Sequence, residues 1–136
     1  MAISIHIVNY YNTTAQNQPG EGYQLLHHLA EEGIDLVAFT AVPVGDRTQF
    51  SLFPKEPTKM EDVARLAGLQ LDGPHSAILV QGDDTLGMLA GLLQKLWRAN
   101  INVFASSGVS DGKGDFGCVL YVGSGQQQAA LEVLQE

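Results

Sequence analysis

Hydrophobic residues recur with two different periods along this chain, and the two periods predict its strands and helices. Ile3, Ile5 and Ile7 alternate with polar residues, which is the period of a strand with one better-buried face. Over residues 21–32 the apolar positions recur every three or four residues, which predicts an amphipathic helix. Gly33 follows directly and favours the left-handed conformation in which many helices end.

A hairpin and a second helix are expected next. Leu36–Val44 and Gln49–Phe53 are rich in strand-forming residues and flank Gly45-Asp46-Arg47, which is typical of a turn between antiparallel strands. Thr58 and Glu61 have the spacing of a capping box, so a helix is expected to begin there. The first half of the chain is therefore predicted to have the order strand, helix, strand, strand, helix.

The second half of the chain repeats this order. Strands are predicted at Ser76–Gln81, Ile101–Ser107 and Phe116–Val122, with helices at Thr85–Arg98 and after a second capping box, Ser124 and Gln127. A shift of 67 residues superposes Gly20 on Gly87 and Leu25-Leu26 on Leu92-Leu93. The chain is therefore interpreted as two copies of one small unit.

Nearer the start of the chain the best match changes, because Ile3–Asn9 resembles His75–Gln81, which requires a larger shift. We therefore expect an extra insertion around Tyr11–Gln18 in the first copy. A short last strand at Leu69-Gln70-Leu71 would complete the first copy, whereas the second copy ends at Glu136 with no segment left for one. The last strand of the second copy is then lost or supplied by another segment.

The predicted fold class is α+β, with two ferredoxin-like β-α-β-β-α units in tandem, each an antiparallel sheet with its helices on one face. The expected units are residues 1–72 and 73–136. A unit this small is marginally stable alone, and the strand containing Leu36, Val37, Ala38 and Phe39 is apolar on both faces. We therefore expect pairing between the copies and between chains, with a homodimer as the first expectation.

Composition and charge restrict the class of function. A net charge of −8 on 136 residues disfavours nucleic acid as a partner, because phosphate binding needs a basic surface. The single cysteine, Cys118, excludes an intrachain disulfide and a thiolate metal cluster. No apolar run reaches the ~18–20 residues of a membrane span, and the first residues lack the basic region of a signal peptide. These features predict a soluble cytoplasmic protein without a membrane partner.

The turn before the first helix of each copy carries the most distinctive residues. These turns read Asn17-Gln18-Pro19-Gly20-Glu21-Gly22 and Gly82-Asp83-Asp84-Thr85-Leu86-Gly87-Met88, and the helices after them are followed by Ile34-Asp35 and Ile101-Asn102. In this pattern nearly the whole chain resembles a tandem pair of the ACT domain family, small ligand-binding modules with a β-α-β-β-α-β plan. Two positions depart from the family pattern: Leu86 stands where proline is usual, and no aspartate precedes Pro19.

The resemblance implies a non-enzymatic regulatory module that binds a free amino acid, or a similar zwitterion, at interfaces between ACT-like units. Such a module would change its own association or that of a separate metabolic enzyme. The partial positive charge of a helix start suits a ligand carboxylate, and a nearby Asp84 or Asn102 would hold the ammonium group. The expected ligand-binding residues are Pro19, Gly20, Glu21, Gly22, Asp35, Asp84, Thr85, Leu86, Gly87, Met88 and Asn102. No catalytic residue, cofactor or metal ligand is predicted.

Other interpretations remain open at this point. The same fold also suits a structural or assembly partner of a separate metabolic enzyme, with no small-molecule ligand. A small enzyme is less favoured, because the titratable residues show no catalytic spacing. Asp84 is equally a good helix N-cap, and the turn glycines are equally needed by the backbone alone. The adjacent His27 and His28 point about 100° apart on a helix and so do not converge on one metal ion.

Overall fold

The computed structural model describes residues 3–136, and these form two compact units. The N-terminal unit consists of residues 9–75, whereas the C-terminal unit combines residues 3–8 with residues 76–136. This division differs from the expected one, 1–72 and 73–136, in the placement of residues 3–8 and 73–75.

The N-terminal unit follows the predicted order of elements. It comprises the second part of β1 (Ile3–Gln16), α1 (Glu21–Glu31), β2 (Leu36–Val44), β3 (Arg47–Pro54), α2 (Pro57–Ala67) and the first part of β4 (Asp72–Asp83). The predicted bounds of β2 are confirmed, and α1 ends one residue before its predicted end. Leu69-Gln70-Leu71 is not a strand, because the last strand of this unit begins at Asp72.

The C-terminal unit has the same order. It comprises the second part of β4, α3 (Met88–Arg98), β5 (Val103–Ser110), β6 (Asp115–Val122), α4 (Gln127–Gln135) and the first part of β1. α3 begins three residues after its predicted start, Thr85, because Gly87 at its N-cap has a left-handed backbone with φ 84°.

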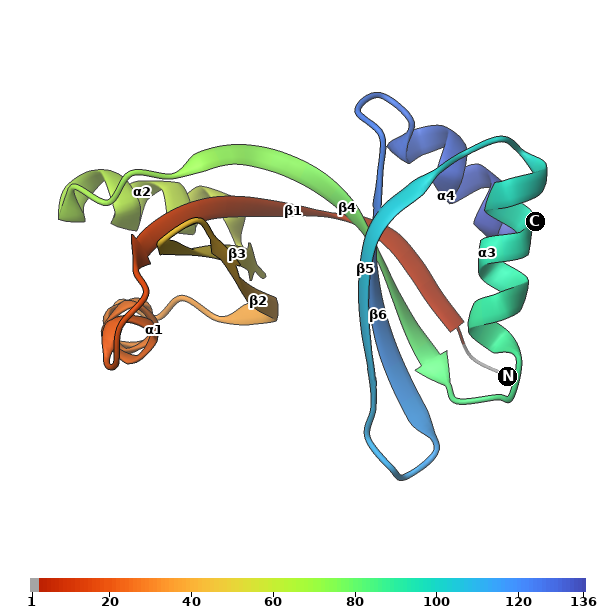
Figure 1. The fold of residues 1–136 in the computed structure, drawn as a ribbon, viewed down its shortest axis with the longest axis horizontal. Helices are drawn as coiled ribbons and strands as arrows, with labels where there is room; N and C mark the ends of the chain where they lie inside the picture. Colours follow the sequence, from red (N-terminus) through yellow and green to blue (C-terminus); the bar gives the residue numbers. More distant parts are fainter. Residues whose placement is uncertain (1–2) are drawn as a thin grey trace. The chain divides into compact units, whose positions relative to one another are not determined.

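The strands follow the order β2-β3-β1-β4-β6-β5 in the sheet. β3 pairs antiparallel with β1 and β2, and β6 pairs antiparallel with β4 and β5. In each unit the first strand therefore lies between the third and the fourth, which is the ferredoxin-like arrangement. Figure 1 shows that the two helices of each unit lie on one face of its strands. The predicted fold class is confirmed.

Strands β1 and β4 each serve both units. Residues 3–8 of β1 form the last strand of the C-terminal unit, and residues 72–75 of β4 form the last strand of the N-terminal unit. The insertion predicted at Tyr11–Gln18 is therefore wrong: β1 continues without interruption to Gln16, and the Tyr11 side chain is buried.

The internal repeat extends to local irregularities of the backbone. With a constant shift of 67 residues, Asn9–Gln16 matches Ser76–Asp83 in the sheet. The first helix of each unit is followed by a left-handed residue, Gly33 at φ 75° and its counterpart Asn100 at φ 59°. The register of β2 against β3 shifts between Leu36 and Ala38, and that of β5 against β6 shifts at the corresponding residues 103 and 105.

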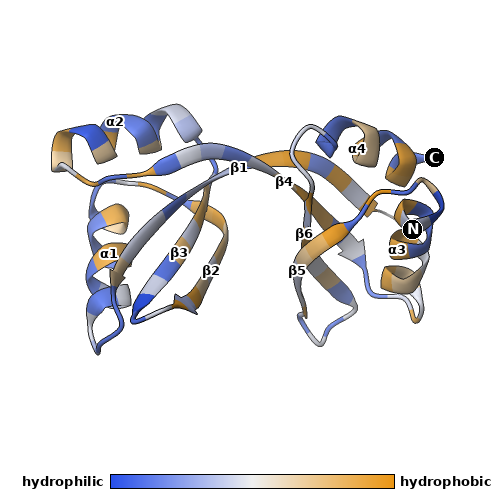
Figure 2. Ribbon diagram, turned by 45° about the horizontal axis from the view of Figure 1, so that its top comes forward, coloured by the Kyte–Doolittle hydropathy of each residue, from blue (hydrophilic) through white to orange (hydrophobic). Residues whose placement is uncertain are grey.

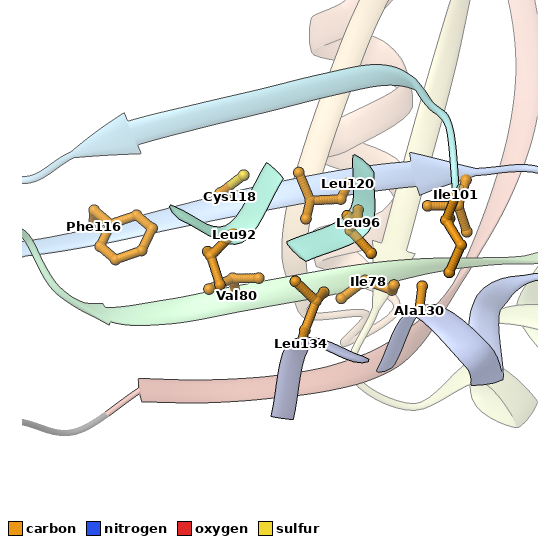
Figure 3. Close-up of a cluster of buried hydrophobic side chains, with 11 residues drawn as sticks. Ile78, Val80, Leu92, Leu96, Ile101, Phe116, Cys118, Leu120, Ala130 and Leu134 are labelled. Carbon is orange, nitrogen blue, oxygen red and sulfur yellow. The ribbon is translucent and has the colours of Figure 1, made fainter. Parts of the chain in front are cut away.

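Each unit has a separate apolar core. Figure 3 shows Leu92 and Leu96 of α3 and Leu134 of α4 packed with strand residues of the C-terminal unit. The buried members of that core are Ile78, Val80, Leu92, Leu96, Ile101, Phe116, Cys118, Leu120, Val122, Ala130 and Leu134, with Ile3 and Ile5 of β1 packed against them. In the N-terminal unit the corresponding core consists of Tyr11, Leu29, Ile34, Phe50, Leu52 and Met60.

Both predicted capping boxes are wrong. α2 begins at Pro57, whose missing N–H needs no cap, and Glu61 accepts a hydrogen bond from the Tyr11 hydroxyl. α4 begins after Gln126, and the side chain of Gln127 accepts a hydrogen bond from the Gly125 N–H at 3.1 Å. The spacing indicated helices at the right places, but the side chains bind other groups.

The two edge strands of the sheet, β2 and β5, expose apolar residues. Figure 2 shows that β2 is hydrophobic along most of its length, and Val42 and Val44 are about half exposed. On β5, Phe104 and Val109 are exposed as well. Within residues 3–136, the only strand next to β2 is β3. We expected β2 to pair with the other copy, and within these residues it does not.

Candidate ligand-binding site

The first helix of each unit begins at a glycine in the left-handed conformation. Gly20 precedes α1 with φ 92°, and Gly87 precedes α3 with φ 84°. Neither N-cap residue makes a side-chain cap hydrogen bond. The first N–H of each helix donates to a carbonyl of the preceding turn, Glu21 to Gln18 at 3.5 Å and Met88 to Thr85 at 3.0 Å. The next two N–H groups of each helix have no acceptor within the helix and can bind an anion, and the helix dipole adds partial positive charge there.

An open groove lies beside each of these helix starts. In the C-terminal unit the groove has a volume of about 610 Å³ and runs along α3 from Gly87, with residues of β1 and α4 on its other sides. In the N-terminal unit a groove of about 510 Å³ runs along α1 from Glu21, with residues of β1, β3 and the end of α2. We call them the C-terminal groove and the N-terminal groove.

The two grooves are lined by equivalent positions of the two helices. Glu21, Gln24, Leu25 and His28 of α1 correspond, with the shift of 67, to Met88, Gly91, Leu92 and Lys95 of α3. The geometry is therefore repeated while the side chains differ. Three of the predicted site residues lie in these grooves: Glu21 in the N-terminal one, and Gly87 and Met88 in the C-terminal one.

Asp84 does not cap α3, because the N-cap is Gly87. The Asp84 carboxylate accepts a hydrogen bond from the Ser110 hydroxyl at 3.1 Å, and its N–H donates to the Gly114 carbonyl at 2.8 Å. These contacts join the turn before α3 to the hairpin between β5 and β6. The predicted helix-capping alternative for Asp84 is therefore wrong, and this carboxylate stabilises a loop contact.

The carboxylate of Asp35 already forms an ion pair with Lys55. Its carboxylate lies 2.8 Å from the Lys55 ammonium group, and its main-chain carbonyl accepts the Lys55 N–H at 2.9 Å. The hydrogen bond and charge of Lys55 lower the pKa of Asp35. Its counterpart Asn102 is exposed at the start of β5.

The remaining predicted site residues divide into exposed and packed positions. Pro19 is exposed, and the Leu86 side chain is fully exposed beside the start of α3. The Thr85 carbonyl accepts the Met88 N–H at 3.0 Å, which shapes the turn. Gly22 lies against Phe50, whose ring would be 3.6 Å from an added Cβ.

Leu86 also begins an exposed apolar stripe along α3. Leu89, Leu93 and Trp97 follow at helical spacing on one face, and they are 42%, 41% and 75% exposed. The sequence pattern groups these residues with Leu96, but Leu96 is buried in the core and the other three are not. We call Leu86, Leu89, Leu93 and Trp97 the α3 stripe.

Sequence reasoning missed the basic side of the C-terminal groove. Lys95 and Arg98 line it together with Gly91, although none of the three belongs to the predicted site. The three residues follow one another at spacings of four and three on the helix after Gly87. Positions at these spacings share one helix face, so the sequence could have indicated a basic face there.

The described residues contain no cluster that suits a metal ion. Among residues 3–136, no group of three or more His, Cys, Asp or Glu side chains is arranged to hold one. His27 and His75 are instead paired with Glu31 and Asp72, at 2.7 Å and 3.0 Å. Burial raises the pKa of the Cys118 thiol, which disfavours the reactive thiolate. None of the described helices is long and apolar enough to cross a membrane.

Comparison with known proteins identifies the fold. No protein-family model and no curated protein matches the chain. Protein BT0572 of Bacteroides thetaiotaomicron is similar in structure, with a TM-score of 0.82, 16% sequence identity and coverage of 96% of this chain and 88% of that one. The fold is ACT-like.

Two further solved structures extend this similarity. The aspartokinase alpha and beta subunits match with a TM-score of 0.65 and 15% identity, over 99% of this chain and 95% of that one. The ligand-free regulatory subunit of aspartate kinase from Thermus thermophilus matches with a TM-score of 0.64 and 16% identity, over 98% and 94% of the two chains. The ACT-like resemblance of the sequence is thus confirmed at the level of the fold.

Proposed function

We propose that this ACT-like protein is a non-enzymatic regulatory module that binds a free amino acid, or a similar small zwitterion, at the glycine-capped helix starts. The observation that carries the proposal is that Gly20 and Gly87 both leave the first helical turn without a side-chain cap, beside an open groove. A ligand carboxylate can approach such a turn closely, because glycine has no side chain to exclude it.

The ammonium group of the zwitterion needs an oxygen partner near the same turn. Asp84 lies four residues before Met88, the first residue of α3, whereas Asn102 follows the opposite end of that helix. The proposal therefore assigns Asp84 to the ammonium group of a ligand at the Gly87 turn, and Asn102 only to that of a ligand bound at the far end of α3. Asp35 is the weaker candidate at its own turn because Lys55 already neutralises it.

We further propose that the protein is cytoplasmic and that the ligand controls its association, either with a second copy or with a separate metabolic enzyme. Its similarity in fold to a regulatory subunit of aspartate kinase supports a role of this kind. The ligand acts by binding one state of association more tightly than the other.

A thermal-shift measurement with each of the twenty amino acids tests the proposal, with nucleotides and keto acids as controls. A ligand at a hundred times its Kd adds about 2.7 kcal/mol of stability, which raises the Tm by several degrees in a chain of this size. A response to one or a few amino acids supports the proposal. A flat panel at millimolar concentrations contradicts it.

Matched variants assign the response to one helix start. Asparagine tolerates the left-handed backbone, so Gly20→Asn and Gly87→Asn add a competing side chain while permitting the turn. Gly112→Asn is the control, because Gly112 is also left-handed, at φ 73°, with open space around it, but lies in the hairpin after β5. The affected turn is the one whose substitution weakens the amino-acid shift while Gly112→Asn does not.

The α3 stripe favours a second function, that of an assembly partner without a small-molecule ligand. Its four apolar residues are exposed together, three on α3 and Leu86 in the turn before it, whereas scattered single residues would need no such explanation. Sedimentation of the wild type against Leu93→Glu tests this function. Leu66→Glu is the control, because Leu66 is an exposed leucine on α2. Assembly that only Leu93→Glu abolishes, together with a flat ligand panel, would favour this second function.

A further inference from the structure

We infer that the C-terminal groove binds a small aliphatic carboxylate, such as the anion of a branched-chain acid, with its charge against Lys95 and Arg98. This inference goes beyond the proposed function, because the ligand is an anion and not a zwitterion. The proposed site extends along α3 as far as Arg98, beyond the turn at the start of the helix.

The groove combines an apolar floor with two cationic side chains. Ile3 and Ile5 of β1, Leu92 of α3 and Leu134 of α4 supply the floor. Lys95 and Arg98 lie on the same face of α3, three residues apart. An aliphatic chain on the floor therefore places a terminal carboxylate within reach of both cations.

Arg98 is available for a ligand. Among residues 3–136 it takes part in none of the ion pairs, which involve Lys55, Arg65 and two histidines. Lys95 donates one hydrogen bond to the Glu136 carbonyl at 2.8 Å and has further N–H donors. A guanidinium group binds a carboxylate through two parallel hydrogen bonds, which gives both strength and orientation.

Gly91 opens the wall of the groove. It lies inside α3, where glycine costs about 1 kcal/mol relative to alanine, and an added Cβ would meet nothing within 4 Å. Packing within the unit therefore does not require a glycine at this position. The missing side chain leaves room for a ligand against the helix backbone.

The charge of the groove distinguishes an anion from an amino acid. Among the described residues, those that line the C-terminal groove include no aspartate or glutamate, so an α-ammonium group lying along α3 would meet Lys95 and Arg98 and no carboxylate. The equivalent N-terminal groove has the opposite character, with Glu21 and His28 where the C-terminal one has Met88 and Lys95, and Gln24 in place of Gly91. Of the two grooves, the C-terminal one therefore offers a carboxylate the pair of cations along its helix.

An NMR titration of the ¹⁵N-labelled full chain tests this inference with three probes that share one branched hydrocarbon tail. Isocaproate carries only the carboxylate, leucine carries both charges, and isoamylamine carries only the ammonium group. We expect isocaproate to bind most tightly and isoamylamine least, with shifted amide signals along α3 and at Ile3 and Ile5. Isocaproate is not an amino acid, so a flat amino-acid panel leaves this result unaffected.

Three variants locate the contact. Arg98→Gln should weaken isocaproate binding about tenfold or more, because hydrogen bonds to charged groups are the strong ones. Lys113→Gln removes the same charge from the exposed hairpin of the same unit and should change the affinity little. Gly91→Leu should fold, since its site is open and helical, and should abolish binding by filling the groove.

Several results would overturn the inference. One is the absence of any isocaproate-dependent shift at millimolar concentration. Others are equal binding of isocaproate and isoamylamine, equal losses in Arg98→Gln and Lys113→Gln, or signals that move along α1 and not α3. Unchanged binding in a folded Gly91→Leu variant would also exclude this groove.

Discussion

Substitution of Ile3 and Ile5 by alanine should destabilise the C-terminal unit. Both residues lie at the start of β1, far in sequence from the rest of that unit, residues 76–136. Their side chains are half-buried and pack against the core of residues 76–136. Truncating a fully buried isoleucine to alanine costs ~2–5 kcal/mol, and a half-buried one about half of that. The double variant should therefore lose roughly 3 kcal/mol of the free energy of unfolding of that unit.

Cys118 provides the assay. It is the only cysteine of the chain and is buried in the same core. An alkylating reagent therefore reaches it mainly when the C-terminal unit opens, and the labelling rate follows the open population when closing is fast. A loss of roughly 3 kcal/mol corresponds to labelling about a hundredfold faster, at 1.4 kcal/mol per factor of ten.

A matched variant in the N-terminal unit controls for general destabilisation. Leu26 and Val63 are also half-buried, but they pack against the other core. Leu26→Ala/Val63→Ala should accelerate Cys118 labelling far less than Ile3→Ala/Ile5→Ala. If the two double variants accelerate labelling equally, or if only the Leu26 and Val63 pair does, residues 3–8 do not complete the C-terminal unit.

Two further predictions concern the N-terminal unit. Gly73→Ala should destabilise the protein by ~1–3 kcal/mol, because Gly73 has φ 144° and an added Cβ would lie 2.9 Å from the Tyr10 carbonyl oxygen. Urea denaturation measures the loss. Gly45→Ala is the control and should lose clearly less, because Gly45 is left-handed but has open space around it. Burial and the hydrogen bond to Glu61 raise the pKa of Tyr11 to about 12. A raised pKa stabilises the fold below the unfolded value of about 10, so this contribution should be lost between pH 10 and 12. Denaturation across that range should show the loss in the wild type, and Tyr11→Phe should show less of it; an equal decline in both would contradict the role of Tyr11.

Most of the fold follows from apolar periodicity. The pattern predicted the bounds of β2 and the end of α1 within one residue, because strands and helices bury one face at fixed spacing. The first strand was misread for a physical reason. Residues 3–8 and 9–16 continue one strand but pack in different cores, and alternation along a strand does not show which core a residue enters.

The candidate site was predicted only in part. The turns containing Gly20 and Gly87 were correctly singled out before the two leucine-rich helices, but the second helix was predicted to begin at Thr85. Glycine adopts left- and right-handed backbones about equally, so the left-handed start at Gly87 could not be predicted from the residue alone. The pairing of Asp35 with Lys55 and of Asp84 with Ser110 depends on contacts between elements. The position of Arg98 in the groove depends on α4 and on β1, which lie far from it in the sequence.

The origin of the C-terminal unit's last strand affects how the chain folds during synthesis. Residues 3–8 are synthesised before residues 76–136, which supply the rest of the core that they join. The Gln135 side chain, for example, donates a hydrogen bond to the Ile5 carbonyl, 130 residues away. Contacts this distant in sequence slow folding because a long loop must close first. During synthesis residues 3–8 therefore remain an unpaired strand, exposed to chaperones, until residues 76–136 have been made.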